Sequence, residues 1–117
     1  MNIEAYRSYC LAKKGVTEEF PFNETTLVFK VMGKMFAVTD IEVFAGINLK
    51  VEPEQGVLLR EQYEFVQPAY HMNKMHWMTV SLEAGAPDRL VLHWTDRSYD
   101  LVVKGLTKSQ KLALDGL

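Results

Sequence analysis

Large apolar side chains recur at every second position between residues 27 and 51, and this period constrains the fold more than any other feature. Three sets follow the pattern: Leu27, Phe29 and Val31; Phe36 and Val38; and Ile47, Leu49 and Val51. A period of two places successive side chains on opposite faces of a strand, so each set marks a face that packs on a core. Gly33-Lys34 predicts a tight hairpin turn in which the glycine takes a positive φ. We therefore predict three consecutive antiparallel strands here.

Helices are predicted around these strands from apolar spacings of three and four. The first covers residues 2–13 and is ended by Gly15, and the second covers residues 53–63 and buries Val57 and Leu58. The third covers residues 85–104. A short last helix is capped by Thr107 and buries Leu112. Pro53 suits the first position of the second helix, because that residue needs no amide hydrogen bond.

The remaining segments complete one sheet. Residues 17–22 are predicted to form a connector, because Pro21 disfavours a long helix. Residues 76–82 are predicted to form a strand with Met78 and Val80 on the apolar face, and a shorter strand near 65–66 precedes it. Strands and helices do not alternate strictly. The prediction is therefore one α+β domain spanning 1–117, α-β(3)-α-β(2)-α, with a mainly antiparallel sheet packed on helices.

Composition narrows the cellular setting. Cys10 is the only cysteine, which excludes a disulfide within the chain and fits a reducing compartment. No apolar run approaches the ~20 residues that span a bilayer, and residues 1–5 lack the basic start of a secretory signal. We therefore expect a cytoplasmic protein without membrane contact. The net charge of −2 counts against a nucleic-acid binder unless the basic residues gather locally.

The positions of the charges suggest such a local gathering. Residues 25–39, 43–51 and 65–82 contain no Asp or Glu, and they coincide with the predicted strands and turns. They carry Lys30, Lys34, Lys50, His71, Lys74 and His76. The outward side of the predicted sheet holds Lys30, Asn48, Lys50, Trp77, Thr79 and Ser81. This side could contact phosphates, but strands are depleted in acids in any case.

A second interpretation of the same side stays open. Val28, Met32, Met35 and Trp77 share the predicted outward side. Exposed apolar side chains grouped in this way favour a protein partner or a second copy of the chain.

Catalytic and metal-binding patterns are weak. His71 and His76 lie five residues apart, which fits neither a strand pair nor a helical pair of metal ligands. Cys10 belongs to an apolar helical stripe and is expected in the core. Ser98 has no base at a helical spacing that would make it a nucleophile, and no glycine-rich phosphate loop occurs. The sequence predicts a binding protein and not an enzyme, with no metal and no cofactor.

Residues 67–77 hold the densest group of unusual residue types. They could form a turn in which Asn73 takes a left-handed conformation. Alternatively, His71 and Lys74 could donate to phosphate while Trp77 supplies a packing surface.

Residues 68–77 also read Pro-Ala-Tyr-His-Met-Asn-Lys, one variable residue, then His-Trp, and this pattern resembles the MmcQ/YjbR family of small bacterial proteins. Further agreement lies in residues 15–22, 28–31, 33–37, 53–54, 59–60 and 98–102. Thr107-Lys108 departs from the family's Leu-Pro-Lys pattern, which affects how the last helix begins.

The resemblance implies an α-β(3)-α-β(2)-α fold similar to secretion chaperones and to CyaY. It also implies a role in binding double-stranded DNA through a double-wing arrangement of hairpins, whereas chaperone-like sheets pair with proteins. The expected DNA contacts are Lys30, Lys34, Lys50, His71, Asn73, Lys74, His76 and Trp77.

Overall fold

A computed structural model describes residues 1–69 and 71–117, so Tyr70 of the 68–77 motif lies outside the described residues. In chain order the elements are α1 (Ile3–Leu11), β1 (Val16–Glu19), β2 (Thr26–Val31), β3 (Lys34–Asp40), β4 (Gly46–Lys50), α2 (Pro53–Gln62), β5 (Val66–Pro68), β6 (Trp77–Ser81), α3 (Asp88–Lys104) and α4 (Lys108–Asp115).

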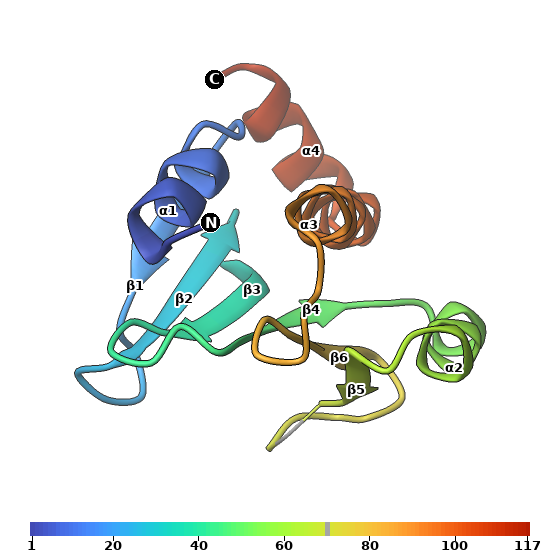
Figure 1. The fold of residues 1–117 in the computed structure, drawn as a ribbon. Helices are drawn as coiled ribbons and strands as arrows, with labels where there is room; N and C mark the ends of the chain where they lie inside the picture. Colours follow the sequence, from blue (N-terminus) through green and yellow to red (C-terminus); the bar gives the residue numbers. More distant parts are fainter. Residues whose placement is uncertain (70) are drawn as a thin grey trace.

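The strands form one six-stranded antiparallel sheet in the order β1-β2-β3-β4-β6-β5. Figure 1 shows α1, α3 and α4 on one side of this sheet, with α2 beside the β5–β6 edge. The predicted class, α+β with an antiparallel sheet packed on helices, is confirmed.

The sheet contains one strand more before α2 than predicted. Residues 16–19 form β1, which pairs with β2 so that Glu19 lies opposite Val28. The segment is short and rich in acid, which is typical of an edge strand that needs only one partner. The prediction of a connector over 17–22 was wrong because Pro21 follows the strand and therefore does not interrupt it.

A β-bulge in β3 changes which side chains face the helices. Phe29 pairs with Ala37 and Lys30 with Met35, which leaves Phe36 as the extra residue on β3. An extra residue reverses the alternation beyond it. Phe36 therefore packs in the core as predicted, but Val38 lies opposite Asn48 on the other side of the sheet, so the prediction for Val38 was wrong.

The β2–β3 turn lies one residue earlier than predicted. Met32 and Gly33 have φ values of 51° and 78°, and Val31 pairs with Lys34 across them. Two consecutive positive φ values characterise a primed hairpin turn. Gly33 thus has the predicted conformation, while Met32 packs partly against the core and leaves the outward side.

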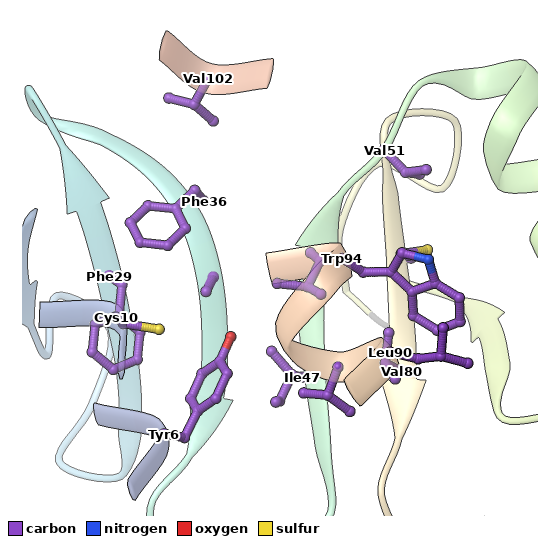
Figure 2. Close-up of a cluster of buried hydrophobic side chains, with 14 of the residues drawn as sticks. Tyr6, Cys10, Phe29, Phe36, Ile47, Val51, Val80, Leu90, Trp94 and Val102 are labelled. Carbon is purple, nitrogen blue, oxygen red and sulfur yellow. The ribbon is translucent and has the colours of Figure 1, made fainter. Parts of the chain in front are cut away.

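The core lies between the sheet and the helices. Figure 2 shows Tyr6 and Cys10 of α1 beside Phe29 and Phe36, and Trp94 and Leu90 of α3 over the β4 and β6 side. Tyr6 meets Phe29 edge to face at 5.9 Å between ring centroids. Cys10 is fully buried, which confirms its predicted place in the core, and burial raises the pKa of its thiol to about 12.

The helices differ from the prediction in what they bury. Val57 and Leu58 of α2 are 47% and 56% exposed, whereas the core receives Leu59 and Gly56. In α4, Leu112 is 64% exposed and Leu114 is buried. These predictions chose the wrong side of each helix, because both segments are short and carry few apolar residues to define a stripe.

The predicted helix ends are right in one case and wrong in another. α1 is shorter than predicted, with Ala12 rather than Gly15 as its C-cap. Thr107 caps α4 as expected, in a capping box with Gln110. Short polar caps of this kind can be recognised locally in a sequence.

Candidate functional site

The face of the sheet that lacks helices carries most of the predicted site. We call it the outer face and define it by Val28, Lys30, Met35, Val38, Asn48, Lys50, Trp77 and Thr79. Asn48 lies opposite Thr79, and Lys50 lies opposite Trp77. The predicted outward placement of these four residues is confirmed.

Asn48 occupies the centre of the outer face. Its Oδ1 accepts a hydrogen bond of 2.6 Å from Thr79 Oγ1, and its Nδ2 donates to Met72 Sδ at 3.3 Å. A thioether sulfur is a weak acceptor. The amide NH₂ therefore retains donor capacity for a better acceptor.

The loop before β6 closes one side of the outer face. Asn73 Oδ1 accepts from the Met75 amide at 2.8 Å, and His76 O accepts from the Val51 amide at 2.9 Å. Among the described residues of this loop, His71 has the positive φ, 61°. The predicted left-handed Asn73 was wrong, because its side chain stabilises the turn by hydrogen bonding instead.

A groove of about 740 Å³ runs between this loop, the outer face and the β1–β2 connection. Its apolar lining includes Phe22, Met35, Val38, Met72 and Trp77. Its polar lining includes Asn23, Asp40, Asn48, His71 and Asn73. Phe22 is 65% exposed at the rim. The size and the mixture of apolar walls with a few polar groups fit a binding site.

The two ends of the sheet differ in charge. We call the end marked by Lys34, Lys50 and Trp77 the basic end, and the end marked by Glu19 and Asp40 the acidic end. Connections at the acidic end cover residues 20–25, 41–45, 63–65 and 82–87. They carry Glu24, Glu42, Glu64 and Glu83 and neither Lys nor Arg.

Connections at the basic end have the opposite balance. They cover residues 12–15, 32–33, 51–52, 69–76 and 105–107. They carry Lys13, Lys14 and Lys74, with Glu52 as the acid, but Lys13 forms an ion pair with Asp96, so Lys14 and Lys74 supply the net positive charge. A chain with a net charge of −2 thus presents a locally positive end.

The structure brings most of the predicted site residues to the basic end. Lys34, Lys50 and Trp77 line one groove of about 240 Å³, while His71, Asn73 and Trp77 line the larger groove. Lys74 and His76 are exposed in the loop that leads into Trp77.

Lys30 differs from the other predicted lysines. Its Nζ lies 2.9 Å from Glu19 Oε2, and its side chain is only 20% exposed. An ion pair neutralises the charge that a phosphate contact would use. Because β1 was not predicted, no pattern in the sequence indicated that Glu19 would reach this face.

Ser98 has a structural role. Its Oγ donates to Phe36 O at 2.5 Å and accepts from the Lys50 amide at 2.8 Å. It thus bridges β3 and β4 at Phe36 and Lys50, one residue beyond the pair formed by Ala37 and Leu49. Within residues 1–69 and 71–117, no three His, Cys, Asp or Glu side chains gather as a metal site, and no helix has the length and apolarity to cross a bilayer.

The YjbR family model matches residues 11–101. The chain belongs to the YjbR family. The Escherichia coli K12 protein described as "Uncharacterized protein YjbR" is 34% identical over 115 residues, which cover 97% of this chain and 98% of that protein. YbdF of E. coli O157:H7, also described as uncharacterized, is 36% identical and covers 76% of this chain and 74% of its own length.

Solved structures support the same assignment. The crystal structure of Deinococcus radiodurans protein DR2400, a DUF419 domain, has a TM-score of 0.89 at 39% identity, covering 97% of this chain and 88% of that chain. A Pseudomonas syringae protein of known structure has a TM-score of 0.71 at 28% identity, covering 86% and 98%. The YjbR membership that residues 68–77 implied is therefore confirmed, as is the α+β class, with one strand more before α2 than the resemblance implied.

The groove also contains residues that sequence reasoning missed. Phe22 and Met72 lie in connections, where periodicity gives no signal. Asp40 and Val38 were excluded by the predicted alternation, which the bulge reverses. Only the placement of the connections over the sheet brings these four side chains together.

Proposed function

We propose that this YjbR-family protein binds duplex DNA weakly, through phosphate contacts from the basic end of its sheet. The observation that supports this most is the separation of charge between the two ends. Phosphate contacts dominate non-specific DNA binding, with dissociation constants on the order of 10⁻⁴–10⁻⁶ M. The acidic end would be repelled by DNA, so the protein would approach with its basic end first.

Three lysines carry the proposal. Lys34 begins β3 at the hairpin tip, Lys74 lies in the β5–β6 loop, and Lys50 lies between these connections at the end of β4. Trp77, opposite Lys50, provides an aromatic surface beside them. Lys30 is left out because Glu19 neutralises it.

Fluorescence anisotropy with a labelled duplex of arbitrary sequence tests this proposal. About three phosphate contacts should give a slope near −3 for log affinity against log salt. Replacing Lys34 and Lys74 by alanine should flatten the slope by roughly two units. Arg89→Ala is the matched control, because Arg89 is exposed in the first turn of α3 at the acidic end.

Two outcomes would contradict DNA binding through the basic end. One is the absence of binding at about 100 µM protein in low salt, where non-specific contacts should be measurable. The other is an equal loss of affinity per charge removed in the Arg89→Ala control, which would indicate attraction to net charge alone.

A second function is favoured by the larger groove. We propose, as the alternative, that the outer face binds an apolar segment of a protein partner or of a second copy of the chain. Met35, Met72 and Trp77 provide an apolar and adaptable lining, and Phe22 is exposed at the rim. Methionine-rich surfaces adapt to varied apolar partners.

Light scattering during size-exclusion chromatography tests the self-association form of the alternative. Met35→Asp should abolish association, whereas salt should have little effect. Leu58→Asp, at an exposed leucine on α2, is the matched control. A chain that remains monomeric at high concentration would exclude a stable homodimer on this face.

A further inference from the structure

A small cleft opens between α3, the start of α2 and the end of β4. Its volume is about 80 Å³, and its polar lining is Lys50, Glu52, Gln55, His93 and Arg97. His93 and Arg97 are four residues apart on α3, so they lie on the same face of that helix. The cleft is distinct from both grooves of the outer face, although Lys50 also lines the smaller groove.

The two strongest cations of this cleft lack acidic partners. Among the residues that the structure describes, the ion pairs within 4.0 Å are Met1–Asp88, Arg7–Glu18, Lys13–Asp96 and Lys30–Glu19. Lys50 and Arg97 belong to none of them. Glu52 is the one acid lining the cleft, and it is exposed at the N-cap of α2.

The start of α2 adds donors on the same side. Pro53 begins the helix, and Glu52 makes no capping hydrogen bond with its side chain. The first amides of a helix have no partners within the helix, and the helix dipole adds positive potential there. Gln55, in the first turn, lines the cleft directly. Uncapped amides and unpaired cations therefore meet at one place.

We propose that this cleft binds a phosphate group, held by Arg97 and Lys50 and oriented by His93 and the first turn of α2. The cleft, of about 80 Å³, has room for a tetrahedral oxyanion, and its open mouth lets the rest of a larger ligand remain in solvent. Leu59 and Trp94 form an apolar wall of the cleft, whereas His93 and Arg97 are exposed, so their charge-assisted hydrogen bonds to the phosphate would form at the mouth of the cleft.

The phosphate group could come from free phosphate or from a nucleic-acid backbone. The site goes beyond the proposed DNA binding, because it depends on Arg97 and His93 and needs neither Lys34 nor Lys74. Lys50 is the residue that the two proposals share.

Titration of the full chain with inorganic phosphate, followed by amide chemical shifts at constant ionic strength, tests the site. We expect saturable shifts at Glu54, Gln55 and Arg97, with a dissociation constant on the order of 1 mM. Arg97→Ala should weaken binding by about tenfold or more, since it removes a charge-assisted contact. Lys104→Ala, an exposed change of equal charge at the end of α3, should leave it unchanged.

Shifts that do not saturate, or equal weakening by Arg97→Ala and Lys104→Ala, would overturn the proposal. A second experiment repeats the titration with duplex DNA in place of inorganic phosphate. If phosphate competes with DNA and Arg97→Ala weakens both, the backbone phosphate occupies the cleft. If phosphate binds while DNA fails to bind at all, the cleft serves a free phosphate group and the DNA proposal alone is lost.

Discussion

The two faces of the sheet are built from alternating residues of the same strands, but they differ in how deeply their side chains are buried. On the helix-covered face, Phe29, Phe36 and Leu49 are fully buried. On the outer face, Val28 and Val38 are buried as well, but Asn48 and Trp77 are only half-buried, and loops instead of helices cover part of the surface. Burial of large apolar side chains dominates stability. The helix-covered face therefore specifies the fold, and the outer face remains available for binding.

The sharpest test of this difference uses two consecutive residues, Phe36 on the covered face and Met35 on the outer face. Phe36→Ala should lower the free energy of unfolding by about 3–5 kcal/mol, as expected when a buried aromatic ring is removed. Met35→Ala should cost about 1 kcal/mol or less, because the side chain is only partly buried. Urea unfolding of both variants measures the two values. Similar losses would show that the two faces contribute equally.

The second prediction concerns the covered face at alkaline pH. Burial raises the pKa of Cys10 from 9.0 to about 12, so the folded state keeps the thiol protonated while the unfolded state ionises. The stabilisation is complete below pH 9 and is lost as the pH rises towards 12. A rise of three pKa units corresponds to a loss of roughly 4 kcal/mol in the free energy of unfolding, as an upper limit.

Urea unfolding of the wild type and of Cys10→Ala between neutral and alkaline pH measures this effect. The variant should lose less stability over the same rise in pH. Some loss should remain, because burial also raises the pKa of Tyr6. A parallel decline in the two proteins would show that the thiol does not contribute.

The third prediction concerns the bridge between the bulge and α3. Ser98→Ala removes the partner of Phe36 O and of the Lys50 amide, and should cost about 1–3 kcal/mol. Ser8→Ala, at an exposed position of α1, controls for the gain in helix propensity. Thermal unfolding of both variants measures the difference. A neutral Ser98→Ala would mean that water replaces the hydroxyl.

The bulge also explains how far the sequence could predict this molecule. Alternation placed Phe29, Leu49 and Met78 correctly, because pairing keeps the period of two in those strands. It failed at Val38, because one extra residue reverses the pattern and no local residue type marks that insertion. Thus the period of two is enough to predict the fold class, but the face of the sheet on which a given side chain lies also depends on tertiary contacts.

The candidate site was less predictable than the fold. Lys50 and Trp77 could be placed on the same side of the sheet in advance, since both lie in regular strands, but their direct pairing could not. Phe22 and His93 could not, because they reach their grooves through the placement of a connection and of a helix. The family motif in residues 68–77 pointed to the loop that lines the larger groove, but the contacts of this loop with Asn48 and Val51, far away in the sequence, depend on the tertiary fold.

The smallest effect is expected from two adjacent acids on β1, Glu18 on the covered side and Glu19 on the outer side. Glu18 accepts two hydrogen bonds from Arg7, which hold the pKa of its carboxyl below the usual 4.5. A lowered pKa stabilises the fold above the unfolded value, and this contribution is lost as the pH falls through the folded value. Glu18→Gln should therefore lower stability slightly at pH 7, and its difference from the wild type should close below about pH 4.5. Chemical unfolding from pH 7 to pH 3, with Arg7→Gln as the partner variant, measures this convergence. A difference that stays constant down to pH 3 would show that Glu18 acts by packing and not by its charge.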